Sequence, residues 1–521
     1  MKKLLIANRG EIAIRIGQTA KELGYSTIAV FPEDDASSLH VQQSDESVQI
    51  PGAGAQAYLN IEEIVNAAKA CAADAIHPGY GFLSENPEFA KACDDAGINF
   101  VGPTADQLSI FGNKAGARAL AAELGIPLVP GTNEDTSLAA VIGFQDQHPD
   151  KGVVIKAISG GGGRGMRIVE NRDDIEKSFE RCQSEANLAF GDDRVYVELL
   201  IHRARHIEVQ IVGDGTGGVT HLWERDCSTQ RQNQKIVEVA PSPDMPDSTR
   251  TALLQASVKM ASHASYRGVG TFEFLVNADQ PDEFFFIEAN ARLQVEHTVT
   301  EAITGLDLVA LQLQIAAGKT LDDLGLGEPP ATNGYAIQCR INMETPGKKG
   351  MFKPTGGTIN IFEPPSGPGI RVDTFGYAGY KTSTRYDSLL AKLIVHSQSE
   401  DFSVCAEKTA RALRQFRLEG FKVNLPFLQT LVGSQDFKNA SLTTRYIDSN
   451  LASLVNEESS DSAPDKAGLA GTKLNTSDPL AVLALGKSDA PSQTQEVTTL
   501  SAAVDGPAGT TAVPAPLQGT I

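Results

Sequence analysis

Short apolar runs alternate with helical patterns along the first 112 residues of the chain. The apolar runs predict strands at residues 4–8, 26–31, 47–50, 74–78 and 98–102. Apolar residues at helical spacing predict helices at residues 11–24 and 61–72. Because strands that alternate with helices favour a parallel sheet with right-handed crossovers, residues 1–112 are predicted to form an α/β domain.

The pattern changes further along the chain. Residues 113–332 contain the polar motifs described below, and residues 333–448 predict a mixed α+β domain that ends near the helical stretch FSVCAEKTARALRQF. From 449 to 512, small and polar residues dominate and aromatic residues are absent, which is typical of a flexible linker. Residues 513–521 (VPAPLQGTI) predict the first strand of a further, truncated domain.

Composition narrows the classes of function. Of 521 residues, 41% are hydrophobic and 21% are charged, as in a soluble protein of several domains. No apolar run approaches the roughly 20 residues that span a bilayer, so we expect a cytoplasmic protein with no membrane partner. Six scattered cysteines without a CxxC pair indicate reduced thiols. The net charge of −20 argues against a nucleic-acid partner but allows a local basic cleft for small anions.

A run of glycines follows the predicted strand GVVIKA and contains Gly162 and Gly163. Consecutive glycines let backbone N–H groups surround an anion without obstruction by Cβ atoms. Lys156, at the end of the strand, supplies a positive charge for a phosphate. We therefore predict a phosphate-binding loop; the alternative is a flexible surface loop, which seldom lies between two strands with flanking Lys and Arg.

Two glutamates lie inside apolar runs that one turn separates. Glu273 belongs to TFEFL and Glu288 to FFFIEAN, and antiparallel pairing would bring both carboxylates to one face. Left alone, the two carboxylates would repel and raise each other's pKa. A hard cation such as Mg²⁺ resolves that conflict, so a metal site is predicted here. The alternative is one glutamate at the surface and one in a salt bridge.

Strict alternation of apolar and polar residues marks the segment Glu288–Glu296, EANARLQVEH with the following histidine. In an extended strand the polar residues would all face one way and span roughly 26 Å, more than one metal–nucleotide site needs. We therefore predict that the chain bends after about Asn290. The alternative is a half-buried strand with one solvated face.

These residues together resemble the biotin carboxylase family of ATP-grasp enzymes, over roughly residues 1–445. The resemblance includes the motifs IANRGEIA, HPGYGFLSEN, GGGGRGM, RHIEVQI, ERDCSTQRQNQK, EANARLQVEH and QCRIN. It implies a Rossmann-like N-terminal α/β domain and a central ATP-grasp domain whose mobile lid covers about residues 130–203. It also implies that a C-terminal mixed α+β domain completes the active site.

The resemblance implies carboxylation of biotin by ATP and bicarbonate through carboxyphosphate. Glu296 would deprotonate bicarbonate, and Arg340 would stabilise the biotin enolate. Divalent metal, Mg²⁺ or Mn²⁺, would bind Glu273, Glu288 and Asn290. Bicarbonate and biotin would contact Lys235, Arg292, Gln294, Val295, Arg340 and Tyr80. The nucleotide would be held by Lys114, Lys156, Gly162, Gly163, Glu198, Ile201, His206, Gln230, Asn233, Glu273 and Glu288.

The biotin itself would be carried on a biotinyl domain outside this sequence, because no AMKM-type motif occurs in it. The expected partners are that carrier and a carboxyltransferase of an acyl-CoA carboxylase, with the module forming a homodimer. The chain departs from the family pattern at Asn233, where His is common, at Leu199, where Lys is common, and at Gln338, where Glu is usual. If the usual glutamate orients Arg340, its replacement would affect biotin turnover.

Two other functions are alternatives to a biotin carboxylase. Another ATP-grasp ligase would share the glycine loop and metal glutamates but lacks the combination of RLQVEH and QCRIN. A non-catalytic nucleotide-binding module would not need the residues Lys235, Glu288, Arg292, Glu296 and Arg340 together. A dinucleotide site at the first turn, residues 8–11, is disfavoured because the turn lacks the GxGxxG glycines.

Overall fold

The computed structural model describes residues 2–132, 135–158, 165–347 and 351–456. The chain begins with a five-stranded parallel sheet in the order β3-β2-β1-β4-β5. The five predicted strands are all present, as β1 (Lys3–Ile6), β2 (Ser26–Phe31), β3 (Glu46–Gln49), β4 (Ala75–His77) and β5 (Asn99–Phe100). The predicted α/β architecture of this region is therefore confirmed.

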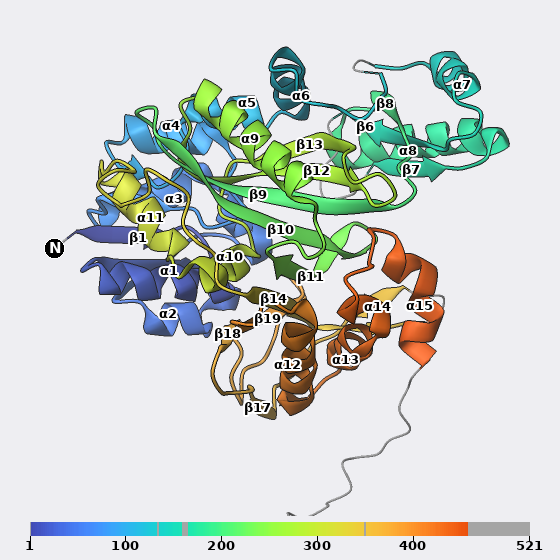
Figure 1. The fold of residues 1–521 in the computed structure, drawn as a ribbon. Coiled ribbons are helices and arrows are strands. Elements are labelled where there is room, and N and C mark those ends of the chain that lie inside the picture. Colours follow the sequence, from blue (N-terminus) through green and yellow to red (C-terminus); the bar gives the residue numbers. More distant parts are fainter. Residues whose placement is uncertain (1, 133–134, 159–164, 348–350, 457–521) are drawn as a thin grey trace, which may run out of the picture. The chain divides into compact units, whose positions relative to one another are not determined.

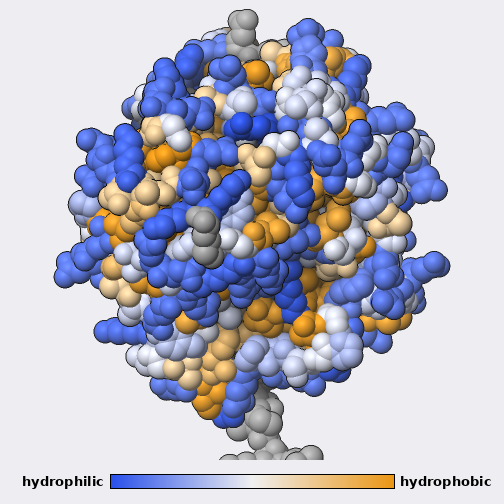
Figure 2. All heavy atoms as spheres, turned by 90° about the vertical axis from the view of Figure 1, so that its left-hand side faces the viewer, coloured by the Kyte–Doolittle hydropathy of each residue, from blue (hydrophilic) through white to orange (hydrophobic). Residues whose placement is uncertain are grey.

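Helices α1 (Gly10–Glu22) to α5 (Ala105–Phe111) accompany this sheet, whereas α6 (Lys114–Glu123) packs against a strand of the central antiparallel sheet. The two predicted helices are α1 and α3 (Ile61–Ala70), and the others are α2 (Leu39–Gln43), α4 (Pro87–Asp95) and α5. Their starts are encoded locally: Thr104 and Gln107 form a reciprocal capping box on α5. Hydrophilic side chains cover most of the face that this end of the molecule presents, with apolar residues scattered between them (Figure 2).

An eight-stranded antiparallel sheet forms the centre of the molecule (Figure 1). In spatial order its strands are β13 (Phe284–Asn290), β12 (Arg267–Asn277), β9 (Ala204–Asp214), β10 (Val219–Arg231), β11 (Gln234–Ala240), β14 (Tyr335–Asn342), β19 (Leu389–Ser397) and β18 (Ile370–Thr374). Helices α9 (Asp247–His263), α10 (His297–Thr304) and α11 (Leu308–Ala316) pack against it. Since β11 pairs with β14, one sheet runs across the boundary predicted at residue 333.

The region predicted to be a lid forms a smaller layer (Figure 1). It has its own hydrophobic core. A three-stranded sheet, β7-β6-β8, is packed by α7 (Leu138–Asp146) and α8 (Ile175–Phe190). Its strands are β6 (Val153–Ala157), β7 (Met166–Val169) and β8 (Val195–Leu199). The predicted phosphate loop joins β6 to β7, but Gly162 and Gly163 lie outside the described residues.

The C-terminal region adds two short antiparallel strand pairs and four helices to the shared sheet. The pairs are β15 (Glu344–Pro346) with β16 (Phe352–Pro354), and β17 (Ile361–Glu363) with β20 (Arg417–Glu419), which is distant in the chain. The helices are α12 (Phe402–Gln415), α13 (Leu425–Gly433), α14 (Gln435–Lys438) and α15 (Tyr446–Asn456). The helix predicted from FSVCAEKTARALRQF is α12, which confirms that prediction.

Helix α15 corrects the predicted start of the linker. Residues 449–456, assigned to the linker by composition, are helical. The reason is burial of Ile447 and Leu454 in the core of the C-terminal region, which offsets the entropy of ordering a polar segment. The rest of the predicted linker and the predicted strand at 513–521 lie outside the described residues.

One further property concerns membranes. Within the described part of the chain, no single helix is both long and apolar enough to cross a bilayer. Only α10 and α11 taken together pass that test by length and composition, and they are bent by 96° relative to each other.

Candidate active site

Lys235 on β11 lies among three buried carboxylates. Its Nζ is 2.5 Å from Glu208 Oε2, 3.1 Å from Glu273 Oε1 and 2.7 Å from Glu296 Oε1. Burial alone would lower the pKa of Lys235, but the three carboxylates raise that pKa well above its usual value. The ammonium therefore stays charged and joins β9, β12 and the start of α10 through one atom.

The two predicted metal glutamates face each other directly. Glu273 on β12 is opposite Glu288 on β13, as the hairpin pattern predicts. Lys114 Nζ is 2.7 Å from Glu288 Oε2, and Asn290 Nδ2 donates to Glu273 Oε1 at 2.7 Å. These three oxygen-bearing side chains form the kind of donor set that Mg²⁺ prefers.

The two carboxylates do not have the raised pKa values expected of a pair left alone. Mutual repulsion would raise both pKa values, and so would burial. Instead Lys235 and His206 hold the pKa of Glu273 at about 2, and Lys114 holds that of Glu288 at about 2. Lysine and histidine side chains from other elements thus already neutralise the pair, and salt bridges of this kind were part of the alternative to a metal.

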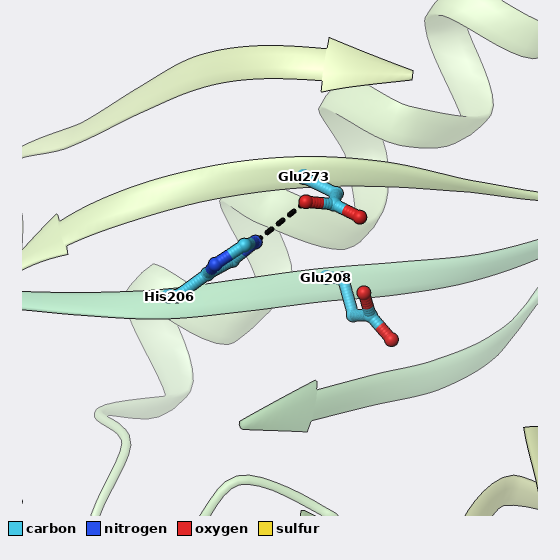
Figure 3. A group of neighbouring side chains, drawn as sticks. All are labelled: His206, Glu208 and Glu273. Atoms are coloured by element: carbon cyan, nitrogen blue, oxygen red, sulfur yellow. Dashed lines mark hydrogen bonds and ion pairs between the residues drawn. The ribbon is translucent and has the colours of Figure 1, made fainter. Parts of the chain in front are cut away.

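His206, Glu208 and Glu273 form a compact cluster on β9 and β12 (Figure 3). His206 Nε2 lies 2.6 Å from Glu273 Oε2, and the other ring nitrogen lies 2.5 Å from Gln230 Nε2. A second group of possible ligands, Glu208, Cys227 and Glu296, is less suited to a metal. Burial raises the pKa of the Cys227 thiol well above its usual value, and Lys235 already binds two of its carboxylates.

The bend predicted in the EANARLQVEH segment is confirmed. Strand β13 ends at Asn290, residue 292 forms a bend, and α10 begins at His297. The bend turns Arg292 back along the segment: its Nη2 donates to Asn290 Oδ1 at 3.0 Å, and its Nη1 donates to Gln294 Oε1 at 2.9 Å. Both halves of the segment therefore lie in one network.

Glu296 is fully buried between two cations. In addition to Lys235, Arg340 Nη2 donates to its Oε2 at 3.0 Å. Burial would raise the pKa of Glu296, but Lys235 and Arg340 hold it below the usual range. A buried carboxylate that is ionised and has cationic neighbours is placed to take a proton from a small anion held beside it.

A second group of predicted residues lies on the three-stranded sheet, after its strand β8 and in the β10–β11 turn. Lys156 on β6 binds Glu198 on β8, and Arg118 Nη1 contacts the same carboxylate at 2.6 Å. Ile201 follows β8 and is half-buried. Asn233 occupies the exposed β10–β11 turn with φ of 64°, a conformation that Asn tolerates better than most residues.

Tyr80 belongs to a chain of contacts that reaches the bent segment. Its hydroxyl donates to Glu11, whose other oxygen is 3.0 Å from Lys392 Nζ. Lys392 also donates to the backbone oxygen of Val295 at 3.2 Å. Tyr80 and Val295, predicted separately, are thus joined through side chains from α1 and β19.

Known protein families and solved structures match most of this chain. The family model described as "Biotin carboxylase, N-terminal domain" matches residues 1–108, and the model described as "Biotin carboxylase C-terminal domain" matches residues 338–449. Between them, "Carbamoyl-phosphate synthase L chain, ATP binding domain" matches residues 113–324. The biotin carboxylase domain of Hydrogenobacter thermophilus 2-oxoglutarate carboxylase is 40% identical, with a TM-score of 0.81 over 87% of this chain and 98% of that one. This chain belongs to the biotin carboxylase family.

Two longer proteins show how such a module is used. Pyruvate carboxylase of Rattus norvegicus, a mitochondrial protein, is 46% identical over 456 residues. The match covers 86% of this chain but only 38% of the rat protein. A single-chain, multi-domain long-chain acyl-CoA carboxylase is 41% identical, with a TM-score of 0.77 over 87% of this chain and 43% of that one. A biotin carboxylase module therefore occurs in carboxylases with different names and acceptors.

Several residues of this biotin carboxylase site were missed in the sequence. They are Glu11, Arg118, Glu208, Arg225, Glu238 and Lys392. Glu208 could have been found, since His206, Glu208 and Gln210 alternate with apolar residues in RHIEVQI and so share one face of β9. Lys392 carried no such signal, because it stands alone in an apolar strand.

Proposed function

We propose that residues 1–457 catalyse the first half-reaction of a biotin-dependent carboxylase, in which ATP and bicarbonate carboxylate biotin on a carrier domain. The observation that supports this function is the position of Glu296. It is a fully buried, ionised carboxylate that contacts Lys235 and Arg340, and Lys235 links it to Glu273 of the metal-type pair. A base, two anion-binding cations and metal ligands thus lie within one network.

The residues fit a divalent ion and a nucleotide. Glu273, Glu288 and Asn290 would hold Mg²⁺, which when bound neutralises charge on the phosphates of ATP. Lys114 and Lys156 would contact those phosphates, and both now bind carboxylates that they can exchange for phosphate oxygens. The lid, with its separate core, would cover the nucleotide and exclude water from the reaction.

Bicarbonate is the substrate that this site would activate. Arg292, Gln294 and Lys235 donate hydrogen bonds that would hold the anion beside Glu296. Glu296 removes its proton, and the resulting oxygen attacks the γ-phosphorus of ATP, which forms carboxyphosphate and releases ADP. Carboxyphosphate then breaks down to CO₂ and phosphate. The phosphate takes the proton of the ureido nitrogen of biotin, and the resulting enolate attacks the CO₂ through that nitrogen. Arg340 and Tyr80 would contact that biotin.

Measuring ADP release by the 521-residue chain in bicarbonate-depleted buffer tests this function. Addition of bicarbonate should start ATP hydrolysis, and free biotin should increase it further. Glu296→Gln should lower the bicarbonate-dependent rate by roughly a hundredfold or more, the range expected for a lost general base. Glu224→Gln is the matched control, because Glu224 is equally buried but binds Arg250 away from the site. ADP release that ignores both bicarbonate and biotin would refute the proposal.

For the final acceptor of the carboxyl group, we propose a wider set of molecules than the acyl-CoA expected from the sequence. Modules of this family belong to carboxylases named for pyruvate, 2-oxoglutarate and long-chain acyl-CoA, so the carboxyltransferase sets the acceptor. A biotinyl carrier and a carboxyltransferase are the partners we propose. We also propose a homodimer, the form given for the 2-oxoglutarate carboxylase domain. A cytoplasmic location stays a prediction, since the rat relative is mitochondrial.

A further inference from the structure

Glu238 on β11 is a buried carboxylate to which no function has been attached so far. It is 0% exposed and uses its two oxygens for different partners. Arg340 Nε donates to Oε1 at 2.5 Å, and Gln338 Nε2 donates to Oε2 at 2.9 Å. Because Glu238 pairs directly with Gln338 across β11 and β14, the backbone itself sets this geometry.

The amide of Gln338 is fixed at its other end as well. Thr298 Oγ1 donates to Gln338 Oε1. Thr298 lies in the first turn of α10, two residues after Glu296. Two hydrogen bonds therefore link β11 and β14 to the start of α10, beside the proposed base, through Glu238, Gln338 and Thr298.

Arg340 is shared between Glu238 and Glu296. Its Nε binds Glu238, and only its Nη2 binds Glu296, at 3.0 Å. Among the described residues, none accepts a hydrogen bond from Nη1 of Arg340. The planar guanidinium is thus oriented by two contacts and keeps its Nη1 amino group for another acceptor.

Without Glu238 the same guanidinium would have a different best partner. Arg and carboxylate groups prefer a bidentate pair with two parallel N–H···O bonds. Arg340 could form that pair with Glu296, since one bond between them already exists. The bidentate pair would bring Arg340 onto Oε1 of Glu296, which Lys235 also contacts, in addition to Oε2. It would also use a further N–H group of Arg340.

We propose that Glu238 is a positioning residue that holds Arg340 away from a bidentate pair with Glu296, and that Gln338 and Thr298 hold Glu238 in place. The division of Arg340 between two carboxylates keeps the base open to bicarbonate and keeps a donor open to biotin. This inference rests on the proposed biotin carboxylase function.

Glu238→Gln tests the inference, with Glu224→Gln as control. The control residue is also a 0% exposed glutamate, and its partner Arg250 is 20% exposed, close to the 18% of Arg340. ADP release is measured at saturating bicarbonate, with ATP and free biotin varied. Glu238→Gln should lower kcat of the biotin-dependent reaction by on the order of ten- to a hundredfold, the cost of misplacing a catalytic group by about 1 Å. The KM for ATP should stay within about twofold, because the nucleotide is held elsewhere.

Gln338→Leu supplies an independent test that keeps the charge of Glu238. It removes one of the two donors to Glu238 and should lower the same kcat by roughly two- to tenfold, as expected for one lost hydrogen bond. If Glu238→Gln does not fold, the kcat of Gln338→Leu alone tests the inference. A kcat of Gln338→Leu or Glu238→Gln equal to that of Glu224→Gln would overturn the inference, and so would a loss confined to the KM for ATP.

The wild-type chain separates this inference from the proposed function. If its ADP release does not respond to bicarbonate and biotin, the proposed function fails and the inference fails with it. If the wild type responds and Glu238→Gln responds equally, only the positioning role is refuted.

Discussion

Replacement of Lys235 by methionine removes the cation on which the site is built. Methionine has a similar length and no charge, so the change leaves Glu208, Glu273 and Glu296 buried with one fewer countercharge. All three carboxylates are at most 4% exposed, so water cannot replace the ammonium. We expect Lys235→Met to destabilise the folded protein as well as inactivate it.

The size of this effect follows from the pKa of Glu273. That pKa is about 2 rather than 4.5, and Lys235 is the strongest of the cations that lower it. Since one pKa unit corresponds to about 1.4 kcal/mol, the cations around Glu273 contribute roughly 3 kcal/mol at neutral pH. Removal of one partner from a buried ion pair costs about 3–5 kcal/mol, and we expect Lys235→Met to lie in that range.

The sign of the pH dependence is also determined. A carboxyl group whose pKa is lowered by folding adds stability above its unfolded pKa, and this is lost as pH falls through the folded pKa. The deficit of Lys235→Met should therefore be full above pH 4.5 and shrink as the pH falls from 4.5 toward 2. Once Glu273 is protonated, the wild type loses the attraction between Lys235 and Glu273, and this difference from Lys235→Met disappears.

Urea unfolding in chelator-containing buffer measures this prediction. The single tryptophan, Trp223, lies on β10 within the same sheet and reports its unfolding by fluorescence. Lys259→Met is the control, because among the described residues Lys259 Nζ donates only to a backbone oxygen, that of Leu124. It should change the free energy of unfolding by about 0.5 kcal/mol or less. An equal stability of Lys235→Met and Lys259→Met at pH 7 would refute the reasoning.

Three further predictions follow from other contacts. Glu288→Gln removes a proposed metal ligand beside Lys114, and should raise the Mg²⁺ concentration for half-maximal ADP release by roughly tenfold or more, with no change if the metal binds elsewhere. Lys392→Met leaves Glu11 buried without its cation and should cost about 3–5 kcal/mol in urea unfolding; wild-type stability would contradict this. Arg340→Ala should lower biotin-dependent ADP release at least tenfold more than the biotin-independent rate, because the proposed contact with biotin contributes only to the biotin-dependent reaction. Equal losses would place Arg340 elsewhere in the reaction.

Local sequence patterns predicted much of the fold because the relevant physics is local. Five strands and two helices of the N-terminal region follow from apolar periodicity, and each is present. The Glu273–Glu288 pair follows from a single hairpin turn. The bend after Asn290 follows from the size of the site that the segment serves. The linker start was misplaced because composition does not report that Ile447 and Leu454 find a core to pack against.

The sequence by itself thus determined the secondary structure, the position of the carboxylate pair and the family to which the chain belongs. Only the tertiary structure decided the charge state of those carboxylates and the surroundings of Glu296. Lys114, Lys235 and Lys392 come from three different elements and meet the carboxylates through folding alone. The energy of a charge depends on its distance to other charges and on burial, and neither quantity is a local property of the chain.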